Sequence, residues 1–249
     1  MRLTTPLEQF EIHILASFSF FKFFDLSITT ITVYSFLVLI FASIFLFFGV
    51  YNATLIPNYW QSVIELMYKF VFDTLNQQAG LKGQKFFPIF FSTFIFIMFA
   101  NLIGLLPFGV TVTAQIIVTF ALAFSFNLGF FFLGLIYHRL KFFNLFVPSD
   151  APSALVPLIV VIEIVSYAIR TFSLSLRLFA NMMAGHTLLH ILSSFIIKFW
   201  QGGLYLIAIF PFGLVLIITV LEFGIAFLQA YVFMILLCIY LNDSLHPGH

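Results

Sequence analysis

Long apolar runs separated by short polar stretches recur along the chain. Residues 28–50 contain no charged side chain, and as a helix this run is long enough to cross a hydrocarbon core about 30 Å thick. Two further apolar runs lie within residues 86–137 and are joined by only a few residues, so they must fold as an antiparallel helical hairpin. The pattern therefore predicts an anchor helix at 28–50 and two more membrane helices in 86–137.

The segment 58–79 has a different pattern, because its polar residues recur at every third or fourth position. These residues are Asn58, Ser62, Glu65, Lys69, Asp73 and Asn76. The other side of the predicted helix carries Trp60, Ile64, Met67, Phe70 and Val71. A helix with one polar and one apolar face is typical of the membrane interface. We therefore expect 58–79 to be an amphipathic helix that lies in the interface.

Two uninterrupted apolar stretches make up the last part of the chain. Residues 154–197 contain no proline after the first turn, and at 1.5 Å per residue they would form a helix of about 60 Å, twice the core thickness. Residues 203–241 are similar, with one proline at Pro211. Each stretch must either break into two short spans or cross at a steep angle, and the lack of helix breakers in the first favours the steep angle. We expect a long, steeply tilted hairpin over 154–241.

The composition agrees with a membrane protein. Hydrophobic residues make up 63% of the sequence and charged residues 8%, whereas about a quarter of the residues are charged in soluble domains. The predicted fold class is therefore an all-α polytopic membrane protein. We expect a single membrane domain over residues 1–249, with about five membrane helices, one interfacial amphipathic helix and contact with the lipid bilayer.

The charge and cysteine content exclude several classes of function. The net charge is +1 with no basic block, and no nucleotide-binding fingerprint occurs, so nothing indicates nucleic acid. The single cysteine, Cys238, excludes a disulfide framework and a cysteine-ligated cluster within the chain. We therefore expect no nucleic-acid partner, no cofactor and no metal.

The distribution of lysine and arginine predicts an orientation. If the interfacial helix and the loop after residue 137 lie on one side, that side has five basic residues and the other side has three. The two sets are Lys69, Lys82, Lys85, Arg139 and Lys141, and Arg2, Lys22 and Lys198. Because basic residues are enriched in inner loops, we expect the amino terminus outside and the carboxyl terminus inside.

Residues 163–190 carry polar groups that are unusual in an apolar segment. Glu163, Arg170 and Arg177 are spaced by seven, so they lie along one slowly drifting stripe of a helix. A charge at membrane depth costs at least about 2.5 kcal/mol on insertion scales. Several charges in one segment therefore indicate a functional site.

If the two long stretches fold back on each other near Gly202, their polar residues form three clusters. The outer cluster is His186 with Glu222, the central cluster is Arg177 with Asn181 and Gln229, and the inner cluster is Glu163 with Asp243. Glutamate and histidine can exchange protons near neutral pH, whereas arginine effectively never loses its proton. Arg177 would therefore block direct passage of a proton, and a carboxylate on a moving partner would have to carry the proton past it.

The motifs around these residues carry a resemblance that extends over essentially the whole chain. SLRLFANMMAGH is followed by LEFGIAFLQAYVF and preceded by FANLIGLLP, and this set resembles subunit a of the F-type ATP synthase in its mitochondrial form. The resemblance implies a non-catalytic, proton-conducting stator subunit of the mitochondrial inner membrane, with its amino terminus toward the intermembrane space and its carboxyl terminus toward the matrix. The implied partners are the ring of c subunits and the other membrane and peripheral-stalk subunits.

The same resemblance implies roles for individual residues. Arg177 matches the family's essential arginine, which faces the c-ring. His186 and Glu222 match the intermembrane-space half-channel, and Glu163 matches the matrix half-channel. Asn181 and Gln229 match residues near the arginine, and Asp243 also matches a residue of the family.

Some sequence features leave two interpretations open. Arg170 is either a second functional cation or an ion-pair partner of Glu163. His190 lies four residues from His186, a spacing that resembles metal ligands, but further ligands are missing and a packing role is favoured. Asn101 and Gln115 either form hydrogen bonds between helices, the interpretation we favour, or line a water path.

Two other classes of protein compete with the proton-path hypothesis. A quinone-linked redox subunit with haem needs histidines that face each other on neighbouring helices, yet the histidines inside the predicted membrane helices lie on one segment. A proton-coupled transporter should show paired repeats with broken helices, and the two halves of this chain look unlike each other.

Overall fold

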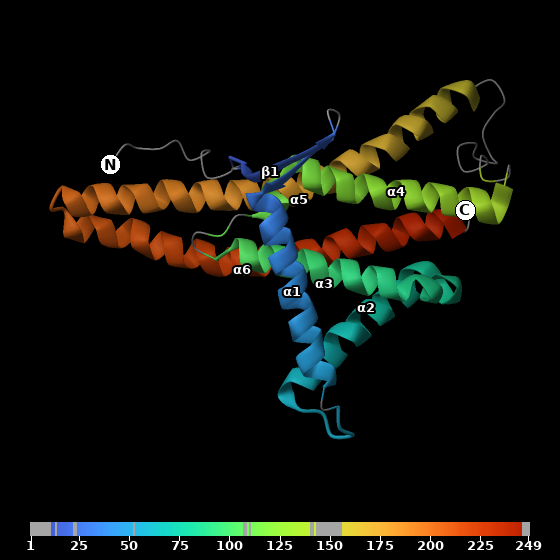
Figure 1. Ribbon diagram of the computed structural model, residues 1–249, viewed down its shortest axis with the longest axis horizontal. Helices are drawn as coiled ribbons and strands as arrows, with labels where there is room; N and C mark the ends of the chain where they lie inside the picture. Colours follow the sequence, from blue (N-terminus) through green and yellow to red (C-terminus); the bar gives the residue numbers. More distant parts are fainter. Residues whose placement is uncertain are drawn as a thin grey trace. The chain divides into compact units, whose positions relative to one another are not determined.

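Long helices dominate the computed structural model, which describes residues 11–12, 14–21, 24–51, 53–106, 109, 111–139, 142 and 156–245. The helices are α1 (Thr30–Val50), α2 (Tyr59–Gly83), α3 (Phe87–Gly104), α4 (Ile116–His138), α5 (Val156–Gln201) and α6 (Tyr205–Leu245), shown in Figure 1. Within these described residues, five helical stretches are long and apolar enough to cross a membrane, and α2 and α3 together count as one of them. The predicted all-α polytopic class is confirmed.

The chain divides into two compact units. The first unit comprises Met1–Ile44, Phe96–Gln115 and Leu178–Ala230, and the second comprises Phe45–Ile95, Ile116–Arg177 and Tyr231–His249. The boundaries fall inside α1, α3, α5 and α6, so each unit contains one part of both long helices. The candidate functional residues are accordingly described unit by unit.

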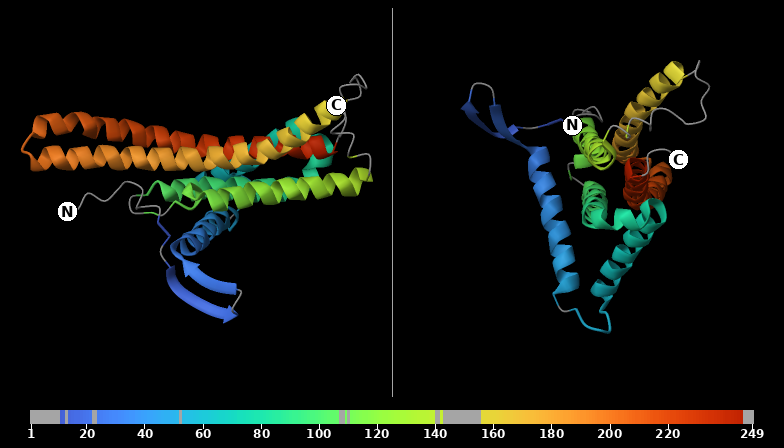
Figure 2. Two further views of the ribbon diagram at one scale, coloured as in Figure 1. Left: turned by 90° about the horizontal axis from the view of Figure 1, so that it is seen from above. Right: turned by 90° about the vertical axis from the view of Figure 1, so that its right-hand side faces the viewer.

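A β-hairpin in the first unit precedes α1 and was not expected from the sequence. Strand β1 (Ile14–Phe21) pairs antiparallel with β2 (Phe24–Thr29), with Ile14 opposite Thr29 (Figure 2). The predicted start of the anchor at residue 28 is wrong by two residues, because Ile28 and Thr29 are the last residues of β2. The backbone N–H of Thr32 donates to the Thr29 hydroxyl, and that of Thr29 donates to the Thr32 hydroxyl, which caps α1.

Helix α2 in the second unit is longer than the amphipathic segment 58–79. Its range extends to Gly83, but Gly80 has a non-helical backbone conformation with φ +62°, so α2 is kinked directly after the predicted segment. Part of its apolar side is covered by protein, since Phe70 contacts Phe94 of α3 and Tyr231 of α6. The interfacial location of α2 stays a prediction.

Helices α3 and α4 are antiparallel in the second unit, as the short connection required. Phe90 near the start of α3 stacks on Phe130 in the second half of α4, with ring centroids 6.1 Å apart. Helix α4 begins at Ile116 rather than at 112, because Val112–Ala114 form a short 3₁₀ turn. Pro107 and Phe108 in the connection, and residues 140–141 and 143–153 of the loop expected after residue 137, lie outside the described residues.

The two long helices are each continuous. Helix α5 has 46 residues, and α6 has 41 residues with Pro211 inside it. A tight turn joins them, in which Gly203 adopts φ +74° and the N–H of Leu204 donates to the carbonyl of Phe199 over 3.0 Å. The prediction of two unbroken helices is confirmed for the described residues, whereas residues 154–155 lie outside them and the steep tilt stays a prediction.

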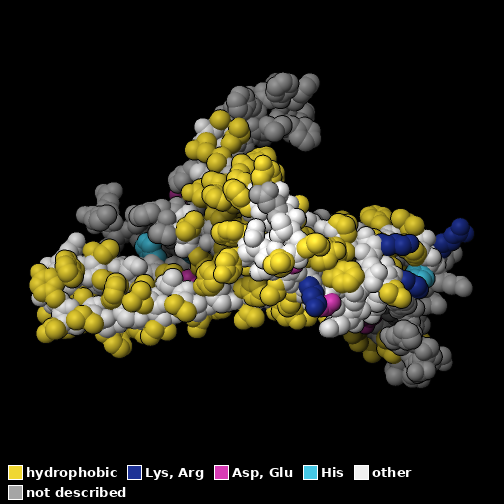
Figure 3. Space-filling model, turned by 90° about the horizontal axis from the view of Figure 1, so that it is seen from below, with side chains coloured by type: hydrophobic (Ala, Val, Ile, Leu, Met, Phe, Trp, Pro, Cys, Tyr) yellow, Lys and Arg dark blue, Asp and Glu magenta, His cyan; other side chains and the backbone are white. Residues whose placement is uncertain are grey.

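Large apolar side chains remain exposed along these helices. Examples are Phe47 and Phe48 on α1, Phe172 on α5 and Phe210 and Phe223 on α6. Hydrophobic side chains are correspondingly frequent on the face drawn in Figure 3. Exposed apolar surface on this scale is expected where lipid or protein partners cover a chain.

Candidate functional site

A buried carboxylate is the main polar feature of the first unit. Glu222 on α6 is 6% exposed, and within the described residues neither of its carboxylate oxygens has a hydrogen-bond partner. Buried polar groups without partners are rare, and they occur where water, an ion or a reacting group binds. Glu222 is therefore a strong functional candidate by geometry as well as by sequence.

Gly185 on α5 creates the space that the Glu222 carboxylate occupies. A Cβ atom placed on Gly185 would lie 2.5 Å from Oε1 and 3.0 Å from Cδ of Glu222, so a side chain at 185 would displace the carboxylate. The sequence did not single out Gly185. The sequence does contain a signal for it: Gly185 lacks a side chain and directly precedes the predicted site residue His186, on the helix expected to contact Glu222.

His186 follows Gly185 on α5 and is part of the same region of the first unit. Its Nε2 atom is buried and has no hydrogen-bond partner among the described residues. The structure thus brings the Glu222 carboxylate to the helical turn that carries His186, as the expected outer cluster requires. We call His186, Gly185 and Glu222 the His186–Glu222 cluster. Its acid and imidazole are two groups that can take up and release protons.

Asn181 and Gln229 form a second contact between α5 and α6 in the first unit. The Asn181 amide donates to Oε1 of Gln229 over 2.8 Å. Gln229 is 4% exposed, and its own amide nitrogen is buried without a partner in the part of the chain that the structure describes. The structure brings these two predicted residues together and leaves one buried donor available.

Asn101 on α3 is fully buried between helices of the first unit. Its amide donates to the backbone carbonyl of Ala226 on α6 over 3.2 Å, and its oxygen accepts from the Thr113 hydroxyl over 2.9 Å. Ala226 lies between Glu222 and Gln229 in the sequence of α6. The favoured interpretation of Asn101 as a helix-to-helix hydrogen bond is confirmed.

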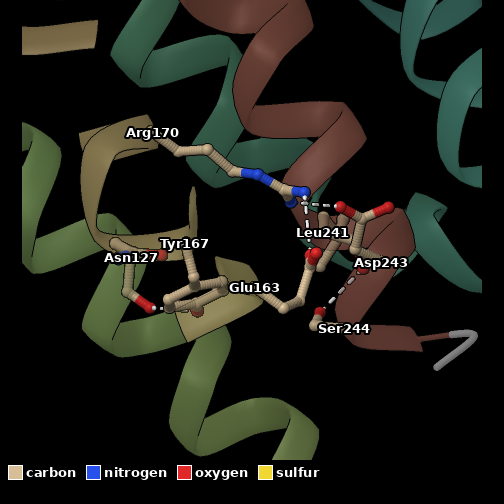
Figure 4. Close-up of polar contacts among 7 residues, drawn as sticks. All are labelled: Asn127, Glu163, Tyr167, Arg170, Leu241, Asp243 and Ser244. Carbon is tan, nitrogen blue, oxygen red and sulfur yellow. Dashed lines mark hydrogen bonds and ion pairs between the residues drawn. The ribbon is translucent and has the colours of Figure 1, made fainter. Parts of the chain in front are cut away.

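The second unit contains an ion cluster around Arg170. The Nη1 atom of Arg170 lies 2.8 Å from Oδ2 of Asp243 on α6, and its Nη2 atom lies 3.6 Å from Oε1 of Glu163 on α5. Figure 4 shows the guanidinium extending from α5 toward both carboxylates. Glu163 and Asp243 are thus brought together as expected, but through Arg170. We call these three residues the Arg170 cluster.

Sequence reasoning therefore captured only part of the role of Arg170. Its pairing with Glu163 was one of two interpretations, and it was based on their spacing of seven residues, which places both on the same side of a helix. The shorter contact with Asp243 was missed, because it depends on how α6 lies against α5, and neither helix encodes that alone. The two interpretations of Arg170 do not exclude each other. Arg170 forms ion pairs, and both carboxylates that it binds are predicted site residues.

Arg177 is an exposed cation near the middle of α5. It is the last residue of this part of the second unit, and within the described residues its guanidinium has no ion pair with a carboxylate. Its predicted grouping with Asn181 and Gln229 joins residues of two different units and stays a prediction. No group of three or more His, Cys, Asp or Glu side chains in the described residues could hold a metal ion.

These features define a class of protein: a multi-pass helical membrane protein with titratable groups between two very long helices. The family model of the ATP synthase A chain matches residues 30–242. The chain therefore belongs to the ATP synthase A chain family. This membership makes it a subunit of an ATP synthase complex and sets aside the quinone-linked and transporter alternatives.

Individual relatives agree with the family model over nearly the whole chain. The chain is 50% identical to the ATP synthase subunit a of Acanthamoeba castellanii over 246 residues, which cover 98% of each protein. It is 45% identical to that of Bartonella bacilliformis over 246 residues, covering 98% of this chain and 97% of the relative. It is 47% identical to that of Brucella canis over 227 residues, covering 90% and 91%. The relatives thus include bacterial proteins.

Proposed function

We propose that the chain is the proton-conducting stator subunit of the ATP synthase membrane sector, with two offset half-channels that lead to and from carboxylates of a c-ring. The observation that carries this proposal is the buried, unpartnered Glu222 carboxylate beside Gly185, the residue that precedes His186 on α5. A carboxylate that is buried without a counter-charge is costly. It is retained where it has a task, and proton transfer is the task that an acid next to an imidazole can perform.

The two clusters would serve opposite sides of the membrane. The His186–Glu222 cluster would form the half-channel from the intermembrane space, and Glu163 with Asp243 would form the half-channel to the matrix. Each cluster lies in its own compact unit and on both long helices. The residues of the two clusters occupy different positions along each long helix, which supports two half-channels rather than one continuous pore.

Arg177 would be the residue that makes the carrier necessary. A charge exposed on an apolar helix is expensive in lipid, so its exposure supports a partner surface with an opposite charge. An arginine next to a passing c-ring carboxylate favours the ionised form of that carboxylate. The carboxylate then gives up its proton on one side of Arg177 and takes up another on the other side, and proton flow is coupled to rotation.

The proposed setting is the inner mitochondrial membrane, with the amino terminus toward the intermembrane space and the carboxyl terminus toward the matrix. The count of basic residues supports this orientation, and the Acanthamoeba relative supports a mitochondrial protein. The whole chain would act as one membrane domain with a non-catalytic role. Its partners would be the c-ring, further membrane and stalk subunits, and lipid.

Replacing the exposed arginine tests this function. In vesicles that contain the assembled complex, Arg177→Ala should abolish ATP-driven proton pumping and ATP synthesis, and Arg177→Lys should also fail because a lysine lacks the planar fork. Arg139→Ala, at an exposed arginine outside both clusters, is the matched control and should keep both activities. Synthesis near the wild-type rate in an assembled Arg177→Ala complex would contradict the proposal.

A further inference from the structure

The Arg170 guanidinium binds two carboxylates that come from different helices. Asp243 lies on α6 at the shorter distance, and Glu163 lies on α5 at the longer one. A guanidinium presents its donors in a rigid planar fork and can hold two carboxylates at once, whereas an ammonium group acts as a point charge. The three side chains together carry a single net negative charge.

Helix α4 holds the part of α5 from which Arg170 projects. The Asn127 amide of α4 donates to the Thr171 hydroxyl over 2.7 Å. The Tyr167 hydroxyl donates to the backbone carbonyl of Asn127 over 3.4 Å (Figure 4). Tyr167 and Thr171 stand on either side of Arg170 in the sequence. The helical turn that carries the guanidinium is therefore tied to a neighbouring helix, which limits where the guanidinium can reach.

The end of α6 that carries Asp243 is fixed as well. Leu241 and Leu245 are buried, and the imidazole Nε2 of His138 lies 3.0 Å from the carbonyl oxygen of Leu245. The ring centroid of Tyr240 lies 5.8 Å from Cζ of Arg170, a distance at which a cation is attracted to an aromatic face. Arg170 and Asp243 therefore both lie on segments that are held in place by contacts with other helices.

We propose that Arg170 is a positioning residue for proton transfer, which holds Glu163 and Asp243 together as one proton-accepting site of single negative charge. This inference rests on the proposed function of the chain. Two neighbouring carboxylates without a cation repel each other, so they move apart or one of them retains a proton. Either change slows the passage of protons through the pair, and Arg170 prevents both.

The pH dependence of this site involves few groups. Among the described residues, the titratable side chains around Arg170 are Glu163 and Tyr167 on α5 and Tyr240 and Asp243 on α6. Asn127, the group that α4 contributes, does not titrate. The charge of the cluster in the working pH range is therefore set by the two carboxylates and the guanidinium.

The test is proton flux in vesicles that contain the whole ATP synthase, with the pH of each side varied in turn. Arg170→Gln should lower flux by about tenfold and move the pH profile of one side toward higher pH, because the carboxylate pair then holds protons more tightly. Arg170→Lys, which keeps the charge, should lie between Arg170→Gln and the wild type. Arg170→Gln combined with Asp243→Asn restores the single negative charge, so flux in this double variant should be at least about threefold higher than in Arg170→Gln alone.

Several results would overturn the proposal. If Arg170 only tied α5 to α6, its loss would lower flux by the same factor at every pH. An unchanged shape of the pH profile in Arg170→Gln therefore contradicts a positioning role. Equal flux in the double variant and in Arg170→Gln contradicts it too. If Arg170→Gln does not assemble, Arg170→Lys supplies the same measurement of the pH profile. Normal flux in Arg170→Gln, alongside lost flux in Arg177→Ala, would overturn this inference and leave the proposed function standing.

Discussion

The His186–Glu222 cluster and the Arg170 cluster differ in how their carboxylates are compensated. In the part of the chain that the structure describes, Glu222 is buried without a partner, whereas Glu163 and Asp243 are partly exposed and paired with a cation. In the first, neither oxygen of Glu222 has a partner among the described residues, and the space for the carboxylate comes from the missing side chain of Gly185. In the second, two carboxylates share one guanidinium. A group without partners is free to bind water or a proton, whereas a compensated group is held in place.

This difference predicts how each cluster responds to substitution. Changes at the His186–Glu222 cluster should act on proton transfer with little effect on folding, because no internal hydrogen bond is lost. Changes at the Arg170 cluster should act on both, since breaking one partner of an ion pair leaves the other charge without compensation.

The largest effect is expected from Glu222→Gln. It keeps the size of the side chain but removes the group that carries the proton, so flux should fall by about a hundredfold or more. Flux is measured in vesicles with the assembled complex, and assembly is checked by native electrophoresis. Glu65→Gln on α2, at an exposed carboxylate outside both clusters, is the control. If Glu222→Gln conducts like the control, Glu222 does not carry protons.

A double-mutant cycle between His186 and Glu222 is expected to show strong coupling. His186→Ala should lower flux by about tenfold or more, and adding Glu222→Gln should lower it no further than Glu222→Gln alone, as for residues that act as a unit. Exchanging the two residues, with His186→Glu and Glu222→His, should retain more flux than His186→Glu or Glu222→His alone. Losses that simply add would show that the two residues act independently.

Gly185→Ala should reduce flux by a smaller factor, about threefold to tenfold. The new Cβ atom would meet the flexible end of Glu222, so the carboxylate must move while the helices stay in place. The thermal midpoint of the complex should therefore be nearly unchanged. Gly213→Ala on α6, where a Cβ atom would meet nothing within 4 Å, is the matched control. A large loss of thermal stability in Gly185→Ala would point to a packing role.

The smallest effect is expected from Asn101→Ala, which removes the hydrogen bond to Ala226 and leaves Thr113 without its acceptor. Loss of a buried hydrogen bond costs about 1–2 kcal/mol. The thermal midpoint should fall, and flux should fall slightly because the anchored part of α6 lies between Glu222 and Gln229. Unchanged stability would show that this contact does not fix α6.

The sequence predicted the helices well because each apolar run must form its backbone hydrogen bonds within a helix when it lies in lipid. It also predicted the pairing of Asn181 with Gln229, and it placed Glu222 near the part of α5 where Gly185 precedes His186, because one turn between two unbroken helices fixes their register approximately. The β-hairpin was missed, although alternating serine and phenylalanine in residues 17–20 is a strand pattern. The Gly185 space and the Arg170–Asp243 contact depend on helix rotation, which the sequence pattern does not specify.

The most direct test of the account is whether the two clusters respond to opposite sides of the membrane. Conservative variants keep enough flux to measure, so Glu222→Asp and Asp243→Glu are compared in vesicles while the pH of each side is varied independently. We predict that Glu222→Asp alters the dependence on the pH of the side that the amino terminus faces, and that Asp243→Glu alters the dependence on the opposite side. If both variants alter the dependence on the same side, the two clusters do not form two half-channels.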